Sequence, residues 1–587
     1  MMLFIRRLTP SSYRNPCFLV PVLHDSWLAF GKRQSKREQH FDPSLSHYLT
    51  LSSSILLVSL VIYPYTFSCV NRSLSGDSHL THSIYTMHFS FGVVVAAFVS
   101  SCLASPGYLR LDVHRSSSSE RLIRRSDDVD ATLNQNTNKL EYLINITVGT
   151  PPQNLAVTLD TGSSDLWVPA SSSSLCKKGK CDEGSFDSSK SSTYTVVEQG
   201  GFNITYAAVG DSDAGDWATD TITVGGSAQI KQQQIGVASS LVDQHGVMGV
   251  GYDTNEAAND EPNGVYQSVM DNMVSDNIIA RKAYSLYLND LRSTQGAIIF
   301  GGVDTTKYTG DLVALPLQAG QTGNVSEFYV TLTGVSYTDH TGKTTQLSPD
   351  GYAQAVLLDS GTSQTYLDDD TFAAIANGFG AVNDGQGDFL VPCDFTNVNG
   401  TVNYAFGGDG GPTVSVPVSQ VIGGKAFSSE NFDDASGGCA LGFGPPIDGI
   451  AILGDTFLRS AYAVYDMDNN VAALAQAAEN QTSTSSIEVI SSGTTLPGAT
   501  FTASATGTQL GGAAATSSPA VPTVSLSGTT MILAGTPTFN LGVSQVTSYS
   551  PSTITKTATS SGGAVSGAAP TAALLGMGLV AGIHMAM

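Results

Sequence analysis

The body of this 587-residue chain has little positive charge. Residues 126–587 carry 14 Lys and Arg against 44 Asp and Glu, whereas residues 1–125 carry 13 against 6. A surface this acidic repels the phosphate backbone of a nucleic acid, and it loses much of its self-repulsion when its carboxylates are protonated in an acidic medium. The composition therefore argues against nucleic-acid binding.

Residues that ligate metals are also scarce. None of the ten His residues lies at a spacing typical of a metal site, so neither a metal nor another cofactor is expected. Three of the seven cysteines lie in N-terminal segments, and the other four are Cys176, Cys181, Cys393 and Cys439. Pairing of sequence neighbours gives two disulfides, one of the three connectivities open to four cysteines. The missing zinc-ligand spacing and the secreted context favour disulfides over a zinc site.

Residues 87–104 resemble a targeting segment. They have a short polar start, an apolar core and an exit of small residues at Ala104, which is typical of a secretory signal peptide. Because this signal begins at an internal Met, residues 1–86 are an uncertain extension with two interpretations. They are a gene-model artefact of the start codon, or a true N-terminus in which residues 49–62 act as a signal anchor.

A basic segment, residues 105–125, follows the signal peptide and ends in the dibasic pair Arg124-Arg125. A dibasic pair between a basic and an acidic stretch is a typical site for a processing protease. We predict that residues 105–125 are a pro-segment whose positive charges lie over an acidic cleft and keep the protein latent. The alternative is a solvated linker.

Long helical periods are scarce in the body. Residues 139–477 show short alternating or apolar runs broken by Gly, Asn, Asp and Ser, which predicts an all-β class with short helices near 264–276 and 369–378. Residues 478–561 are rich in Ser and Thr and poor in charge. Such a composition does not bury a core, and it predicts an O-glycosylated stalk.

The final segment, residues 562–587, combines small residues, a spacer and a terminal apolar run. This is the pattern for attachment of a glycosylphosphatidylinositol (GPI) lipid, with Gly562 as the predicted attachment site to within two residues. The alternative is a tail-anchor helix, which at about 16 residues is short for a bilayer. Five N-glycosylation sequons also fit a secreted chain, at Asn145, Asn203, Asn324, Asn399 and Asn480.

One short motif occurs twice in the body, as Asp160-Thr161-Gly162-Ser163 and as Asp359-Ser360-Gly361-Thr362. In each copy the Asp ends an apolar run, which predicts a buried strand that enters a tight turn. An Asx-turn is the ordinary reason for an Asp before Gly, but two copies in matched settings indicate a shared role.

Two carboxylates in one cleft share a proton, because like charges a few ångströms apart raise one pKa. The ionised Asp then takes a proton from water while the protonated Asp donates one to a carbonyl oxygen, which hydrolyses an amide without a covalent intermediate. We predict this role for Asp160 and Asp359.

Gly162 and Gly361 let the backbone turn sharply and a substrate chain approach closely. We expect the hydroxyls of Ser163 and Thr362 to orient the carboxylates, and those of Thr161 and Ser360 to lock the two loops together.

The two motifs and the sequence around them resemble the pepsin-like (family A1) aspartic proteases. The resemblance covers about residues 139–477 and includes, in order, residues 142–153, 160–169, 202–206, 246–251, 296–304 and 451–455. It implies an all-β, bilobal fold with the active-site cleft between two related lobes. The lobes would span about 139–302 and 303–477 of a peptidase domain at 126–477.

Carried over residue by residue, the resemblance implies that Asp160 and Asp359 are the catalytic pair. Tyr206 then becomes the tyrosine of the flap, the hairpin that closes over bound peptide, and Trp167 its hydrogen-bond partner. The family usually has Gly after this tyrosine, whereas this chain has Ala207, which puts the shape of the flap tip in doubt.

The same resemblance matches Cys176 with Cys181 and Cys393 with Cys439. Ser360 stands where many relatives have Thr, which still supplies a hydroxyl. The signal peptide, pro-segment, stalk and GPI pattern together resemble the yapsin-type, surface-anchored branch found in fungi. Such relatives favour basic residues in their substrates, and the Asp-rich stretch 211–220 could supply counter-charges.

We therefore expect a monomeric aspartic endopeptidase that cleaves polypeptides at acidic pH. The resemblance implies transport through the secretory pathway to the plasma membrane or cell wall, where a GPI lipid anchors the protein and cell-wall glycans are further partners. The alternatives are a catalytically inactive pepsin-like protein that binds peptide or glycan, and a structural or adhesion protein of the cell wall.

Overall fold

The computed structural model separates the chain into two units, residues 1–103 and 104–587. In the first unit it describes the antiparallel pair β1 (Ser68–Asn71) and β2 (Ser83–Thr86). In the second unit it describes residues 107–115, 141–206, 212–226, 228–260, 264–293, 295–319, 323–383, 389–422, 438–481, 485–493, 495–501, 530–533, 537–542 and 552–555. The predicted signal peptide, Gly562 and the GPI signal lie outside the described residues.

Fourteen strands of the second unit form one sheet, in the order β29-β14-β27-β26-β11-β12-β3-β4-β5-β10-β6-β9-β8-β7. The last seven strands in this order build the first lobe. They are β4 (Tyr142–Val148), β5 (Gln153–Asp160), β6 (Leu166–Pro169), β7 (Thr195–Thr205), β8 (Ser212–Val224), β9 (Ala228–Ser240) and β10 (Gly246–Gly249). The other seven continue the sheet toward the second lobe. They are β3 (Leu109–Arg115), β11 (Ala283–Tyr287), β12 (Gln295–Phe300), β14 (Tyr308–Pro316), β26 (Ala461–Asp466), β27 (Val471–Ala477) and β29 (Ala499–Phe501).

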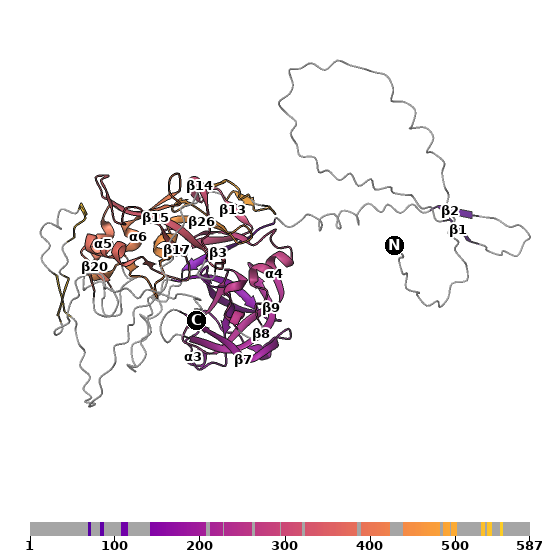
Figure 1. Ribbon diagram of the computed structural model, residues 1–587. Helices are drawn as coiled ribbons and strands as arrows, with labels where there is room; N and C mark the ends of the chain where they lie inside the picture. Colours follow the sequence, from indigo (N-terminus) through magenta and orange to yellow (C-terminus); the bar gives the residue numbers. More distant parts are fainter. Residues whose placement is uncertain are drawn as a thin grey trace, which may run out of the picture. The chain divides into compact units, whose positions relative to one another are not determined.

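The second lobe has an eight-stranded sheet in the order β22-β21-β15-β17-β25-β18-β24, with β16 paired to β15. Its strands are β15 (Tyr329–Thr338), β16 (Thr344–Gln346), β17 (Gln354–Leu358), β18 (Thr365–Tyr366), β21 (Thr401–Phe406), β22 (Thr413–Pro417), β24 (Phe443–Gly444) and β25 (Ile452–Leu453). A smaller sheet joins β19 (Val382–Asn383), β20 (Phe389–Pro392) and β23 (Gly438–Ala440). Figure 1 shows β7, β8 and β9 in one lobe and β15, β17 and α5 in the other. The predicted all-β, bilobal fold is confirmed.

Helices are few and short, as the sequence predicts. The two expected near 264–276 and 369–378 are α4 (Val269–Ser275) and α5 (Asp369–Phe379). Ser268 and Asp271 form a capping box at the start of α4, and the side chain of Asp368 caps the start of α5. Gly380, with φ 66°, ends α5 in the left-handed region that favours glycine. Within the described residues, the other α-helices are α3 (Ser174–Lys177), α6 (Val418–Val421) and α7 (Asp455–Leu458).

The same strand arrangement occurs once in each lobe and carries the two Asp-containing motifs. In the first lobe β10 runs parallel to β5 and antiparallel to β6, and Gly249 is the register partner of Asp160. In the second lobe β25 runs parallel to β17 and antiparallel to β18, and Leu453 is the partner of Leu358. Each motif therefore leaves its strand at a point where a neighbouring strand crosses behind it. This matched arrangement explains why the motif recurs.

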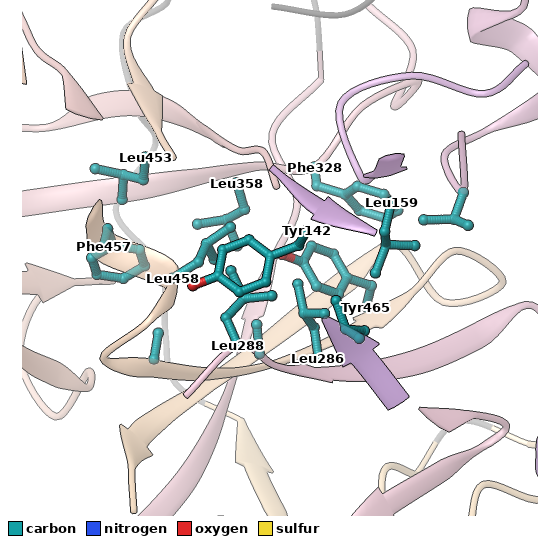
Figure 2. Close-up of a cluster of buried hydrophobic side chains, with 14 of the residues drawn as sticks. Tyr142, Leu159, Leu286, Leu288, Phe328, Leu358, Leu453, Phe457, Leu458 and Tyr465 are labelled. Carbon is teal, nitrogen blue, oxygen red and sulfur yellow. The ribbon is translucent and has the colours of Figure 1, made fainter. Parts of the chain in front are cut away.

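Buried aromatic and aliphatic side chains join the two lobes behind these motifs. Leu159 and Leu358, which directly precede Asp160 and Asp359, belong to the cluster drawn in Figure 2 together with Phe328 and Tyr465. The rings of Phe328 and Tyr465 lie edge to face with centroids 4.7 Å apart. A continuous apolar base of this kind holds both motif loops on one rigid support.

Part of the predicted pro-segment is a strand of the sheet. β3 lies between β12 and β4, and its Val113 is fully buried. The expectation that the positive charges of this segment cover a cleft is wrong for Arg110, because its guanidinium pairs with the buried Asp304 at 3.5 Å. Removal of residues 105–125 by processing stays a prediction.

The predicted start of the stalk at residue 478 is wrong. β28 (Ile487–Val489) pairs with β13 (Gly302–Asp304), and β29 pairs with β14. Ile490 and Leu496 are buried in the same core cluster, so the folded body continues to residue 501. These few apolar side chains suffice because a preformed sheet edge receives them. Within the described residues, no helix is long and apolar enough to cross a membrane.

Candidate active site

The two Asp-containing loops make nearly the same set of hydrogen bonds. Asp160 is the last residue of β5, and its Oδ1 accepts from the Gly162 N–H at 2.8 Å while its Oδ2 accepts from the Ser163 hydroxyl at 2.5 Å. Asp359 follows β17 and accepts from the Gly361 N–H at 2.8 Å and from the Thr362 hydroxyl at 2.6 Å. These bonds fix the planes of both carboxyl groups, which is the contact predicted for Ser163 and Thr362.

Thr161 and Ser360 join the two loops. The Thr161 N–H donates to the Ser360 hydroxyl at 3.2 Å, and the Ser360 N–H donates to the Thr161 hydroxyl at 2.9 Å. Each hydroxyl in turn donates to a carbonyl of the opposite loop: Thr161 to Leu358 at 2.9 Å and Ser360 to Leu159 at 2.8 Å. All four bonds are buried, so the two loops are held in one fixed relative position. Serine in place of threonine keeps the full set.

The carboxyl groups of Asp160 and Asp359 face each other. A Cβ added to Gly162 would lie 2.6 Å from the Asp359 carboxyl carbon, and one added to Gly361 would lie 2.4 Å from Oδ1 of Asp160. Only glycine fits at either position, because a carboxyl group from the opposite loop occupies the space of a side chain. Both aspartates are fully buried.

Burial governs the protonation of this pair. Desolvation, followed by the charge of Asp160, raises the pKa of Asp359 well above its ordinary value. Desolvation also raises the pKa of Asp160, although hydrogen bonds from Ser163 and Asp359 oppose the shift. Two carboxyls in this setting do not ionise together, so the pair holds one proton over a wide pH range and the proton belongs to the pair.

Tyr206 and Trp167 lie together in the first lobe. The indole Nε1–H of Trp167 donates to the Tyr206 hydroxyl at 2.5 Å, and both side chains are buried. They pack with Phe202, Ile204 and Trp217. Tyr206 follows directly after β7, where the chain enters the connection between β7 and β8, and Ala207 at the expected tip of the hairpin lies outside the described residues. The hydrogen bond predicted for this pair is present.

The Asp-rich stretch is largely committed to structural hydrogen bonds. The buried Asp213 accepts from the Val242 N–H at 2.9 Å, and Asp220 accepts from the Thr193 hydroxyl at 2.5 Å. Asp216 accepts from the Gly200 N–H at 2.8 Å. These three carboxylates hold β8 to its neighbouring segments, which is a structural role; Asp211 lies outside the described residues, and a counter-charge for substrate from this stretch stays a prediction.

Sequence reasoning missed a buried acid behind the first loop, Glu256. Its Oε2 accepts from the Tyr266 N–H at 2.9 Å, and the Tyr266 hydroxyl donates to Asp165 at 2.7 Å. Desolvation raises the pKa of Glu256 to about 9, so its carboxyl is neutral in acid. The neighbouring Asn255 donates from Nδ2 to the Gly162 carbonyl at 3.3 Å, which ties this segment to the first loop.

A second acid that sequence reasoning missed is Glu327, just before β15. The following residues of β15 pair with β17 from Tyr329 and Leu357 onward, and the Phe328 carbonyl accepts from the Leu358 N–H at 3.2 Å, so Glu327 lies at the end of this ladder. Burial raises the pKa of Glu327 to about 7. Its burial depends on the pairing of strands that are far apart in the sequence, so no local pattern could have found it.

Both predicted disulfides are present, Cys176–Cys181 and Cys393–Cys439. The first closes the loop that contains α3, and the second joins β23 to the end of β20. Among the described residues, no group of His, Cys, Asp and Glu is arranged to hold a metal ion.

Residues 141–477 match the family model of eukaryotic aspartyl protease. The chain is 39% identical over 404 residues to a "Probable aspartic-type endopeptidase opsB" of Aspergillus oryzae, covering 67% of this chain and 81% of that protein. It is 38% identical over 442 residues to the protein of the same name from Aspergillus fumigatus, covering 72% and 89%. It is 39% identical over 349 residues to "Secreted aspartic protease 3" of Candida albicans, covering 58% and 80%.

Proposed function

Because the chain belongs to the eukaryotic aspartyl protease family and is an aspartic-type endopeptidase, we propose that it acts at the cell surface, in an acidic medium, with Asp160 and Asp359 as its catalytic pair. The observation that carries this proposal is the meeting of two fully buried carboxyl groups across Gly162 and Gly361. Hydrolysis of a polypeptide chain is enough to explain this arrangement of the two carboxyl groups.

The geometry supports direct attack by water. One carboxyl of the pair is protonated and donates a hydrogen bond to the carbonyl oxygen of the peptide bond, while the other, ionised, accepts a proton from the attacking water. As the water oxygen bonds to the carbonyl carbon, the first proton passes to the carbonyl oxygen, which leaves a neutral diol. Neither aspartate forms a covalent bond to the substrate.

Breakdown of the diol returns both aspartates to their starting protonation states. The aspartate that took the water proton donates it to the peptide nitrogen, and the carbon–nitrogen bond breaks. One diol hydroxyl returns its proton to the other aspartate as the carboxyl product forms. The bonds from Ser163 and Thr362 keep both carboxyl planes fixed throughout, so little reorganisation is needed during reaction.

Buried carboxyls outside the pair support an acidic working pH. Glu256 and Glu327 have pKa values of about 9 and about 7 in the folded protein, against 4.5 for an ordinary Glu. The folded chain therefore keeps protons that the unfolded chain loses, and the stability they contribute is fully present below pH 4.5. It falls by about 1.4 kcal/mol per pH unit and per proton as the pH rises through 4.5 to 7 for Glu327 and to 9 for Glu256.

The termini support export and anchoring. Residues 87–104 have the pattern of a signal peptide, and residues 562–587 have that of a GPI signal with Gly562 as the attachment site. On this proposal residues 105–125 are removed at Arg124-Arg125, and the sequence between the folded body and Gly562 is the stalk. A relative from Candida albicans carries the name "Secreted aspartic protease 3".

Expression of the full chain in a fungal host tests the proposal. We expect intact cells to cleave a denatured protein at about pH 3 to 5, with little activity at neutral pH. A phospholipase C specific for phosphatidylinositol should release the activity into the medium. A matched chain that ends at residue 561 should be secreted without an anchor. Activity that stays on the cell after phospholipase treatment, or when the chain ends at residue 561, would contradict the anchor. An optimum at neutral pH would contradict the proposed acidic medium.

A further inference from the structure

A short segment far along the Ser/Thr-rich stretch, residues 537–542, packs on the second lobe. Its aromatic residue, Phe539, stacks on Tyr337 of β15 with centroids 4.1 Å apart and an interplanar angle of 11°. It also meets Phe379 of α5 edge to face at 5.1 Å and 85°. Tyr337 and Phe379 are themselves in edge-to-face contact at 5.9 Å. The three rings form one mutual cluster, which is the geometry that aromatic side chains prefer.

Gly378 forms the floor of this aromatic site. A Cβ added to Gly378 would lie 2.0 Å from the Phe539 ring, so the ring occupies the place where any other residue would have its side chain. Glycine is a poor residue for the last turn of a helix, where alanine is much preferred. Its presence in α5 leaves room for the incoming ring and gives the helix no advantage of its own.

The end of α5 also supplies a hydrogen-bond acceptor. The last carbonyls of a helix have no partner within the helix. Here the N–H groups of Thr538 and Phe539 both donate to the Gly378 carbonyl, each at 3.0 Å. The segment therefore satisfies a helix-end carbonyl with its own backbone, which fixes its path as well as the position of its ring.

The β15–β16 hairpin holds the other end of the segment. Asn540 donates from Nδ2 to the Asp339 carboxylate at 3.0 Å, and Leu541 is 3% exposed. Gly542 lies against the ring of His340, where an added Cβ would be 2.5 Å from Nδ1. Aromatic stacking, backbone hydrogen bonds and a side-chain hydrogen bond thus act on three consecutive residues, Thr538, Phe539 and Asn540.

We propose that residues 537–542 are a docking segment, and that the site formed by Tyr337, Gly378 and Phe379 is its receptor on the second lobe. Among the described residues beyond 477, the chain is then held on the body by residues 485–501 and by residues 537–542. The stalk that connects the body to the surface continues after residue 542.

This docking shortens the reach of the anchored enzyme, a consequence that rests on the proposed GPI attachment at Gly562. A flexible chain from residue 502 to 561 has a root-mean-square length of about 45 Å, whereas docking of residues 537–542 and the pairing of β30 (Thr530–Leu533) with β31 (Ser552–Thr555) leave a shorter free segment. The docked form keeps the peptidase close to the surface, with the second lobe next to the anchor. Its substrates are then proteins of the same surface more than proteins of the medium.

Hydrogen–deuterium exchange on the full-length protein tests the docking directly. In the wild type, the amides of Thr538 and Phe539 should be protected. Phe539→Ala should remove the ring and Gly378→Ala should block its place, so each should speed exchange of these amides by at least about tenfold. Thr538→Ala is the matched control, because its exposed side chain makes only one hydrogen bond, at 3.5 Å. It should leave the protection unchanged.

Cleavage of a soluble peptide separates this test from folding and from the proposed function. Neither Phe539 nor Gly378 contributes to the catalytic pair, so all three variants should cleave the peptide at the wild-type rate. Amides of 538 and 539 that exchange as fast in the wild type as in Phe539→Ala would overturn the docking proposal, whatever the outcome of the anchor experiment. Retained protection in Gly378→Ala would overturn the assignment of the receptor site.

Discussion

Replacing Asp359 with Asn should lower kcat by about 10³-fold or more without unfolding the protein. Asn has the shape of the carboxyl group: its Oδ1 can accept from the Gly361 N–H, and its Nδ2 can donate to the Thr362 hydroxyl, the two groups that hold Asp359 at 2.8 Å and 2.6 Å. It can neither bind nor release a proton at working pH, so the shared proton disappears and with it the acid–base pair. Asp160→Asn should have an effect of the same size.

The double variant gives a further diagnostic. Because the two carboxyls act as a unit, losing both should cost little more than losing either. Asp220→Asn is the matched control: Asp220 is buried and accepts from the Thr193 hydroxyl, but it belongs to the β8 hairpin. This control should keep wild-type kcat. An Asp359→Asn enzyme with more than about a tenth of wild-type activity would refute the assignment of the pair.

Replacing Gly162 with Ala should lower kcat by about 10²-fold or more, although no reacting group is removed. The new methyl group would lie 2.6 Å from the Asp359 carboxyl carbon, and the opposite loop cannot retreat because Thr161 and Ser360 lock it in place. The carboxyl must turn or shift, and a displacement of about 1 Å at a reacting group costs on the order of 10²-fold in rate. Gly361→Ala, which crowds Asp160 at 2.4 Å, should behave alike.

Gly334→Ala is the matched control for both glycine variants. Its new methyl group would meet its nearest neighbour at 3.6 Å, an ordinary contact, on a strand of the second lobe. We expect wild-type kcat for this variant and folded protein for all three, measured by the thermal unfolding midpoint. Near-normal kcat in Gly162→Ala would mean that the two carboxyls are not as close as the structure shows.

Several of the features that sequence reasoning predicted are determined over a few residues, whereas the Thr161–Ser360 and Trp167–Tyr206 contacts were predicted from the paired motif and the family resemblance. Each Asp motif is a strand followed by a tight turn, and its hydrogen bonds join residues two or three positions apart, so the pattern is complete within the motif. The disulfide Cys176–Cys181 is equally local. Cys393–Cys439 spans 46 residues, and its prediction follows because pairing Cys176 with its sequence neighbour Cys181 leaves these two cysteines for each other.

The features that sequence reasoning missed depend on pairing between distant segments of the chain. The carboxyl group of Glu327 is buried at the end of the β15–β17 ladder, whose two strands are far apart in the sequence. Ile490 and Leu496 belong to the core, although they lie in a stretch whose average composition predicts no core, because the edge of a sheet is already present to receive them. Phe539 likewise lies in a stretch whose composition predicts no core, and it packs on the second lobe. Composition describes an average over many residues, whereas one aromatic ring with a shaped site is enough to fix a segment.

The pH dependence of kcat/KM for the wild-type enzyme tests the central claim most directly. A pair that works with one shared proton is inactive when it holds two protons and inactive when it holds none. Burial raises the pKa of both Asp160 and Asp359, so the second proton loss occurs above the ordinary range of a carboxyl group. We predict a bell-shaped profile with an acidic optimum and a tenfold loss per pH unit on each side. A profile that rises to a plateau at neutral pH would contradict the shared-proton mechanism.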